Sequence, residues 1–226
     1  MFTPPLTTHS LPFHPWAVLS AILLCANTLH AAPTGLLNDT GQTTCDNGGD
    51  SLVNCQDNAT IPGQDGHFGR DASVKPTEKK GSGAAGFDFT RICMDGSSNC
   101  AGSADTGSNP APSAWACTKD NHTNLIWSLA TQQGQKMTSY TDNRCGFSTG
   151  WRLPTRLELL SIVHNGTNSP AIDTQFFPGT SSGPYWTSEL HILDGSRAWT
   201  IDFRYGAASY ADLTTPLYLR LVRDGE

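Results

Sequence analysis

Two glycine motifs have the spacing of loops that bind nucleotides or carry a nucleophile. Residues 81–86 match G-x-G-x-x-G, and residues 179–183 match G-x-S-x-G. The nucleotide loop needs a buried strand before it and a helix after it, but Lys79 and Lys80 precede this one. The nucleophile loop joins a strand to a helix, but here Pro184 follows directly. We therefore expect a flexible linker at the first motif, a plain loop at the second, and neither a cofactor nor a catalytic residue.

Side chains that could bind a metal ion are scattered along the chain. The four histidines after residue 31 show no spacing typical of metal ligands, and we interpret them as surface or packing residues: His67, His122, His164 and His191. Four aspartates with Asn and Gly neighbours could offer oxygen ligands to calcium: Asp46, Asp50, Asp57 and Asp65. They lack the D-x-D-x-D-G spacing, and the same residue types favour turns. We expect no metal site, with calcium in these loops as the alternative.

An apolar segment near the N-terminus has the features of an export signal. Residues 16–29 are apolar, too short to span a bilayer comfortably, and followed by Ala31 and Ala32. We expect a signal peptide over residues 1–31, cut after Ala31, with a buried N-terminal helix as the alternative. The mature protein would be secreted or held at the cell surface, in the periplasm or outside the cell, without stable insertion into a membrane.

Removal of the signal peptide would leave an even number of cysteines. Cys25 is removed with it, and six cysteines remain: Cys45, Cys55, Cys93, Cys100, Cys117 and Cys145. An even count in an exported chain predicts a disulfide framework. Short turn-rich loops favour Cys45 with Cys55 and Cys93 with Cys100, which leaves Cys117 with Cys145. A zinc site or a redox dithiol is disfavoured because the chain has no C-x-x-C motif.

Composition divides the chain near Trp115. The 226 residues carry a formal net charge of -6, and an acidic chain without a basic run lacks the electrostatic footprint that nucleic acid requires. All five Tyr and five of the six Trp lie from Trp115 onward. We therefore expect a loop-rich, disulfide-bridged N-terminal extension over residues 32–114 and the main folding domain over residues 115–226.

One helix and several strands are predicted in the second half. Residues 155–163 begin with a capping box, Thr155 and Glu158, and carry apolar side chains at helical spacing. Strand-like runs follow over residues 185–190, 198–205, 209–213 and 218–222. On the last run, Arg220 and Arg223 fall on opposite faces, so one of them is expected inward against a carboxylate such as Asp202. One main helix followed by an antiparallel sheet predicts an α+β fold, loop-rich and disulfide-stapled.

A set of motifs in fixed order resembles a known family. The motifs are W-A-C at 115–117, D-N-H-T-N-L-I-W at 120–127, C-G at 145–146, G-W-R-L-P-T at 150–155, Y-W-T-S at 185–188, A-W-T-I-D-F at 198–203 and R-L-V-R at 220–223. In these the chain resembles the Lcl C-terminal-like domain family of bacterial exported proteins, named for the collagen-like adhesin of Legionella. The resemblance implies a C-type-lectin-like module, with a role in surface attachment or glycan binding and no known catalytic site.

Three functions fit such a module. The first is non-enzymatic ligand binding, with a glycan or another surface ligand as the partner in glycan binding or adhesion. The second is a structural role in a pilus or cell-surface assembly. The third is an enzyme on a lectin-like fold, which would need accessible thiols. We prefer the first and expect no enzyme activity.

The predicted ligand site lies on the hairpin over residues 198–212. Tyr205 and Tyr210 offer aromatic rings there, and Arg204 and Asp212 offer hydrogen bonds to hydroxyl or carboxylate groups. The other face of the hairpin, with Trp199, Ile201 and Phe203, is expected to pack on the core. The alternative is a tight turn whose tyrosines only cover the edge of the sheet.

Overall fold

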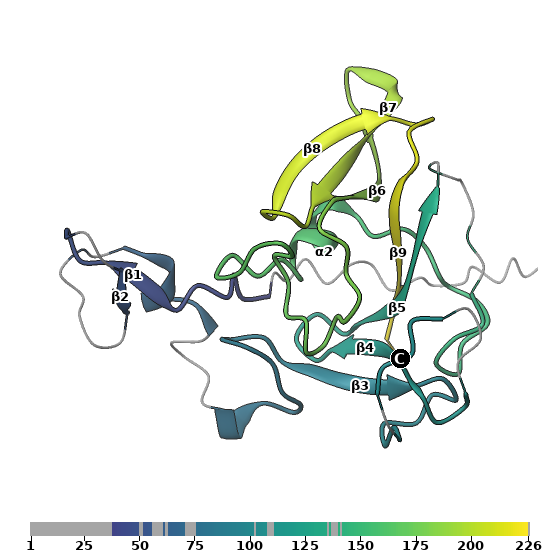
Figure 1. Ribbon diagram of the computed structural model, residues 1–226, viewed down its shortest axis with the longest axis horizontal. Helices are drawn as coiled ribbons and strands as arrows, with labels where there is room; N and C mark the ends of the chain where they lie inside the picture. Colours follow the sequence, from purple (N-terminus) through teal and green to yellow (C-terminus); the bar gives the residue numbers. More distant parts are fainter. Residues whose placement is uncertain are drawn as a thin grey trace, which may run out of the picture.

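Figure 1 shows the computed structural model, which describes residues 38–49, 52–55, 61, 63–70, 76–101, 103–107, 111–134, 136, 140 and 142–225. The expected signal peptide, residues 1–31, lies outside these ranges. Within them, no helix has the length and apolar character that crossing a lipid bilayer requires.

Strands make up most of the regular structure. A small sheet comes first, formed by β1 (Thr44–Asp46) and β2 (Leu52–Asn54), and two 3-10 helices follow, η1 (Asp65–His67) and η2 (Pro76–Glu78). The remaining elements are β3 (Phe89–Cys93), β4 (Trp115–Asp120), β5 (Leu125–Gly134), α2 (Arg156–Leu160), β6 (Pro184–His191), β7 (Asp194–Asp202), β8 (Ala207–Asp212) and β9 (Leu217–Asp224).

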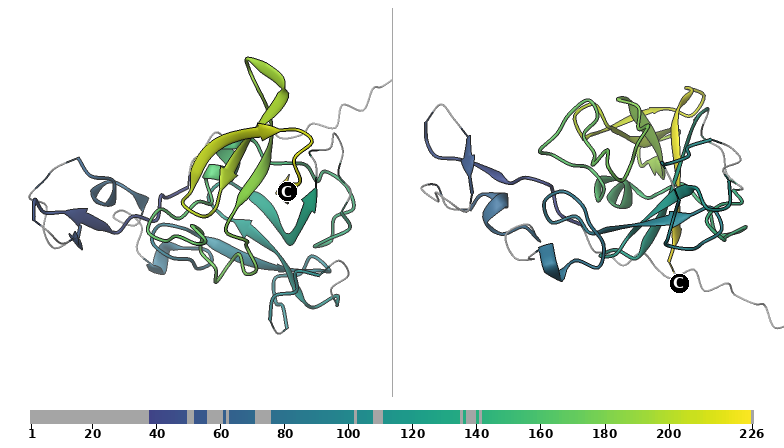
Figure 2. Two further views of the ribbon diagram at one scale, coloured as in Figure 1. Left: turned by 45° about the horizontal axis from the view of Figure 1, so that its top comes forward. Right: turned by 60° about the horizontal axis from the view of Figure 1, so that its bottom comes forward.

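Strands β3 to β9 form one seven-stranded sheet in the order β3-β4-β5-β9-β6-β7-β8. Neighbouring strands are antiparallel except β6 and β9, which are parallel at Tyr185 and Tyr218. The last strand, β9, therefore lies in the middle and joins two antiparallel groups. Figures 1 and 2 show these groups as the lower and upper parts of the molecule, with the β1–β2 sheet extending away from them.

The expected α+β, C-type-lectin-like fold is wrong. The fold is mostly β: the sheet is mixed rather than purely antiparallel, and the longest α-helix in the described part of the chain, α2, has five residues. The capping box is present as predicted, because the Thr155 side chain accepts from the N–H of Glu158 and the Glu158 side chain accepts from the N–H of Thr155. The helix ends early because the following backbone bonds to distant partners: the N–H of His164 to the carbonyl of Ala171, and that of Asn165 to the carbonyl of Thr40.

Both faces of the sheet are covered, which explains why strands such as β4 are buried almost throughout. One face packs under α2 and the loops around it, and its core contains Phe89, Trp127, Leu159, Phe177, Tyr185, Ile201 and Phe203 among others. The opposite face packs under the segment from Cys145 to Leu153, with Trp151, Trp186 and Leu221 in its core. The apolar area that stabilises the fold is therefore split between two layers on one sheet.

The three predicted disulfides are present. Cys45 is bonded to Cys55, Cys93 to Cys100, and Cys117 to Cys145. The first joins β1 to the residue after β2, and the second closes the loop after β3. The third joins the buried strand β4 to the segment that covers the second core, and both of its cysteines are fully buried.

The segment before Trp115 contributes to the main sheet. Strand β3 is hydrogen-bonded to β4, and Phe87 and Phe89 are buried in the first core. The segment over residues 81–86, expected as a flexible linker, lies against this strand, because Ser82 and Phe89 exchange two backbone hydrogen bonds. Whether residues 115–226 fold independently stays a prediction.

Candidate functional site

Three partly exposed rings meet on the β6–β7–β8 part of the sheet, and we call this surface the aromatic face: His191, Trp199 and Tyr210. The centroids of Trp199 and Tyr210 are 6.1 Å apart in an edge-to-face arrangement. The His191 ring lies 4.6 Å from Tyr210 and 5.6 Å from Trp199. Because Tyr210 is 47% exposed, the cluster is open to a ligand from solvent.

Strand pairing brings these rings together. Trp199 and Tyr210 face each other in the β7–β8 register. The N–H of Leu213 donates to the carbonyl of Ser196 at 2.9 Å, and counting along the antiparallel ladder from this pair makes Trp199 and Tyr210 a non-hydrogen-bonded pair. Facing side chains are closest in such pairs. His191 is the last residue of β6 and is paired with Asp194, the first residue of β7, across a short turn. This position places its ring beside the other two.

Two arginines lie over the rings of the aromatic face. Arg156 places its guanidinium carbon 4.4 Å from the centroid of Trp199, and Arg197 places its own 5.5 Å from the centroid of Tyr210. Both distances are within the range of cation–π attraction. Each arginine comes from a different element, α2 or β7, so the helix and the hairpin together build the rim of the surface.

Carboxylates balance these cations. Arg197 donates to Asp212 at 3.0 Å and lies 3.4 Å from Asp194, while Arg156 lies 3.9 Å from Glu189. Hydrogen bonds from Ser196 lower the pKa of Asp194, and the hydrogen bond to Asp212 raises the pKa of Arg197, so these groups are ionised at neutral pH. Two cations against three anions leave the surface without the positive charge that a polyanionic ligand requires.

The predicted site residues fall into two groups. Tyr210 and Asp212 lie on β8 at the aromatic face, whereas Arg204 and Tyr205 lie in the turn between β7 and β8 at the other end of the hairpin. Tyr205 is 69% exposed, and none of the ring contacts among the described residues joins it to Tyr210. The assignment of all four to ligand binding stays a prediction, but the structure brings only the first two to one surface with other rings.

Sequence reasoning missed Trp199 and His191 as site residues. The alternation of Trp199 with Ile201 and Phe203 placed all three on the core side, and the last two are indeed buried in the first core. Trp199 is only partly buried, because the hairpin continues beyond the core and its rings pack on one another instead. No signal in the sequence separated Trp199 from Ile201 and Phe203, because alternation places all three side chains on one face of the strand.

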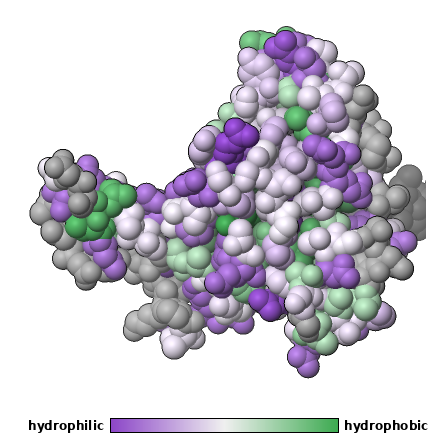
Figure 3. All heavy atoms as spheres, viewed as in Figure 1, coloured by the Kyte–Doolittle hydropathy of each residue, from purple (hydrophilic) through white to green (hydrophobic). Residues whose placement is uncertain are grey.

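The tip beside the aromatic face is apolar. Ile192 and Leu193, in the turn between β6 and β7, are 91% and 87% exposed. Figure 3 shows hydrophobic and hydrophilic residues side by side at this end of the molecule. A ligand on the aromatic face would therefore border an apolar surface at one end.

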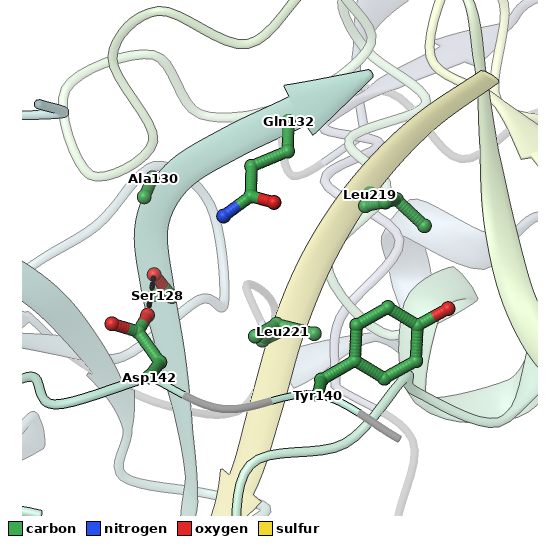
Figure 4. Close-up of a pocket in the computed structure, with 7 residues that line it drawn as sticks. All are labelled: Ser128, Ala130, Gln132, Tyr140, Asp142, Leu219 and Leu221. Atoms are coloured by element: carbon green, nitrogen blue, oxygen red, sulfur yellow. Dashed lines mark hydrogen bonds between the residues drawn. The ribbon is translucent and has the colours of Figure 1, made fainter. Parts of the chain in front are cut away.

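A separate small pocket lies where β5 bends beside β9 (Figure 4). Leu219 and Leu221 form one side, and the hydroxyl of Ser128 donates to Asp142 at 3.3 Å on the other. The pocket has room for about one water molecule. It is too small to hold a sugar or a cofactor.

Among the described residues, one group of side chains that could bind a metal ion lies close together: Cys45, Cys55 and His67. Both sulfurs are used in the disulfide, so no thiolate is available there. Of the aspartates considered for calcium, Asp50 and Asp57 lie outside the described residues. Asp46 accepts a hydrogen bond from the backbone of Gly48, as expected of a turn residue.

The comparisons with known proteins support one assignment. Residues 116–223 match the family model of the Lcl C-terminal domain. Neither the search of curated proteins nor the search of solved structures gave a match. The matched range begins in β4 and ends in β9, so it contains the aromatic face and most of the sheet. The resemblance noted in the sequence is confirmed over residues 116–223, which match the Lcl C-terminal domain family.

Proposed function

We propose that this protein is a non-enzymatic, exported module that binds neutral glycans at the aromatic face and so serves in surface attachment. The observation that carries the proposal is the group of partly exposed rings, His191, Trp199 and Tyr210, flanked by Arg197 and its carboxylate partners. Sugar rings present flat apolar faces to aromatic side chains, and their hydroxyl groups bond to planar charged groups.

Export is indicated by two findings. The chain contains an Lcl C-terminal domain, and the described part of it contains three disulfides. Disulfides of this kind form and persist in oxidising compartments. That residues 1–31 are the export signal, and that the mature protein is secreted or held at the cell surface, are part of the proposal.

A binding role is supported over cysteine-dependent catalysis by the state of the described cysteines. All six are joined in pairs, whereas such catalysis needs an accessible thiolate. A neutral ligand is favoured over a sulfated or carboxylated one because three carboxylates and two guanidinium groups surround the rings.

The test is an oligosaccharide array probed with the full chain after export into an oxidising compartment, followed by titration calorimetry with the best neutral ligand. We expect Tyr210→Ala to weaken binding about tenfold or more, corresponding to ~1.4 kcal/mol. Tyr205→Ala is the matched control, because it removes an exposed tyrosine from the same hairpin outside the aromatic face. Thermal unfolding of both variants should stay near that of the unmodified protein.

The opposite pattern would move the site. If Tyr205→Ala or Arg204→Ala abolishes binding while Tyr210→Ala does not, the ligand binds at the turn. Preferential binding of sulfated oligosaccharides would contradict the neutral-glycan proposal. Absence of any bound oligosaccharide would favour the structural role in a surface assembly.

A further inference from the structure

The two edges of the main sheet differ in how they are protected. At one edge, β3 is bonded to its own chain, since Ser82 and Phe89 exchange backbone hydrogen bonds and the N–H of Cys93 donates to the carbonyl of Ser97. At the other edge lies β8, the outer strand of the upper part of the molecule in Figures 1 and 2. Among the described residues, no hydrogen bond reaches the outer side of residues 207–211.

The register of β7 and β8 shows which backbone groups point outward. The hydrogen bond from Leu213 to Ser196 fixes the alternation of the ladder. Trp199 with Tyr210, and the pairs two residues away on either side, are therefore non-hydrogen-bonded. It follows that Ala208, Tyr210 and Asp212 direct their N–H and C=O groups away from β7.

Apart from the charged Asp212 at its end, strand β8 carries none of the usual features that prevent edge pairing. Its sequence is A-A-S-Y-A-D, with no lysine, proline or glycine, and its six pairs with β7 run without a bulge. Edge strands commonly avoid association by such features. Small side chains at four of the six positions also allow another strand to approach closely.

We propose that β8 pairs with the β8 strand of a second copy of this chain, antiparallel, around a two-fold axis between Ser209 and the partner's Ser209. The outward groups of β8 allow this register, in which Ala208 exchanges hydrogen bonds with the partner's Tyr210. The pairing places each large tyrosine opposite a small alanine, on the same face of the joined sheet.

Charge complementarity favours a second copy over another extended chain. In this register Asp212 lies one residue beyond the partner's Ala207, the first residue of β8, and so beside the turn that carries the partner's Arg204. Arg204 is exposed and takes part in no ion pair among the described residues. Asp212 is also exposed, although it already contacts Arg197. The two-fold axis repeats this contact at both ends, as an isologous interface requires.

The pairing would join two ligand surfaces into one. Because the axis is perpendicular to the joined sheet, both Tyr210 rings lie on the same side of it. That the two rings belong to ligand sites rests on the proposed function, whereas the dimer itself does not. Two linked sites bind a multivalent surface more tightly than one, provided that both can be engaged at once. The inferred dimer would thus suit attachment to a glycan-bearing surface.

Sedimentation and cross-linking of the full, exported chain test the dimer. We expect the sedimenting mass to double as concentration rises, and Ala208→Pro, which removes an outward-facing donor, to keep the protein monomeric. Ser209→Cys should form an intermolecular disulfide, because facing Cα atoms in a non-hydrogen-bonded pair are ~4.5 Å apart. Ala207→Cys is the control on the same face, since the two copies of that residue would be ~13 Å apart along the strands.

The outcomes are distinguishable. A monomer mass at every concentration overturns the proposal, as does equal cross-linking of Ser209→Cys and Ala207→Cys. If Ala208→Pro fails to fold, cross-linking of the cysteine variants still decides between the two results. Loss of glycan binding in a protein that still dimerises would count against the proposed function alone.

Discussion

Arg152 holds Glu158 by both terminal nitrogens of its guanidinium group. The Nη1 atom donates to Oε2 at 2.8 Å and the Nη2 atom donates to Oε1 at 2.8 Å, while Nη2 also donates to Asp224 at 3.0 Å. The same carboxylate accepts the N–H of Thr155 at 2.7 Å in the capping box. One side chain therefore ties the start of α2 to the segment before it and, through Arg152, to the end of β9.

Glu158→Gln should destabilise the protein and flatten its acid response. Burial alone would raise the pKa of Glu158, but hydrogen bonds from Arg152 and from the N–H of Thr155 lower it below its ordinary value of 4.5. A carboxyl whose folded pKa is depressed stabilises above the unfolded pKa and loses that contribution as pH falls through the folded pKa. We expect a loss of about 2–4 kcal/mol at pH 7, measured by urea unfolding, and a smaller fall in stability on acidification below 4.5 than in the unmodified protein.

Glu189→Gln is the control for this change. Its carboxylate lies 3.9 Å from Arg156 and is 38% exposed, so its loss should cost less than ~1 kcal/mol. Equal losses of unfolding free energy in the two variants at pH 7 would show that the paired hydrogen bonds between Arg152 and Glu158 stabilise the protein no more than an exposed ion pair does.

The disulfide between Cys117 and Cys145 should contribute most of the three. Its cysteines are 28 residues apart, against 10 and 7 for the other two. The chain-entropy model gives about 3.6 kcal/mol for the long loop and about 2.5–2.8 kcal/mol for the short ones. Replacing each pair with alanines and comparing urea midpoints should rank them in this order, and a larger loss from either short loop would contradict the ranking.

The features that could be predicted from the sequence are local ones. The capping box depends on residues three apart, and two disulfides depend on short loops, so neither needs knowledge of the whole fold. The pairing of Cys117 with Cys145 followed once the others were assigned. The hairpin ending at Asp212 was also visible from alternation, because its two strands are adjacent in the sequence.

Features that depend on distant contacts were not predictable in this way. The position of β9 between β5 and β6 joins strands from opposite ends of the domain, and β3 pairs with β4 across a loop that leaves no periodic signal. The helix was overestimated because the apolar spacing of residues 155–163 also suits a turn packed under a sheet. For the site, Trp199 was placed on the core side because alternation cannot show where a core ends along a strand.

Phe89→Ala should destabilise the protein although it lies before the predicted domain boundary at Trp115. Phe89 is 1% exposed and packs edge-to-face on Phe177 with centroids 5.2 Å apart. Replacing a phenylalanine buried in this way by alanine lowers the free energy of unfolding by about 3–5 kcal/mol. We expect a fragment of residues 76–226 to be more stable to urea than one of residues 115–226, which lacks both Phe89 and β3. Equal stability of the two fragments would show that the boundary at Trp115 marks an independent folding unit.

Arg220 is fully buried, and the expected carboxylate partner is not there. It donates instead to the carbonyl of Ser128 at 2.9 Å and to the hydroxyl of Thr180 at 2.8 Å, and its guanidinium lies over the rings of Phe177 and Tyr185. No ion pair among the described residues includes it, and its Nε atom has no hydrogen-bond partner among them. Burial accordingly lowers the pKa of Arg220.

Lysine should be a worse replacement at this position than methionine. Arg220→Lys keeps a buried cation but loses the planar fork that reaches Ser128 and Thr180 together, whereas Arg220→Met removes the charge and keeps much of the volume. At pH 7 we expect Lys to cost about 2–4 kcal/mol and Met less. A buried lysine has a depressed pKa, so the unfolded state binds more protons and the stability of the Lys variant rises with pH as the folded state loses its charge. Urea unfolding of both variants at pH 7 and at about pH 9.5, just below the ordinary lysine pKa, measures this. A Lys variant that is as stable as the Met variant and no more dependent on pH would mean that water reaches Arg220.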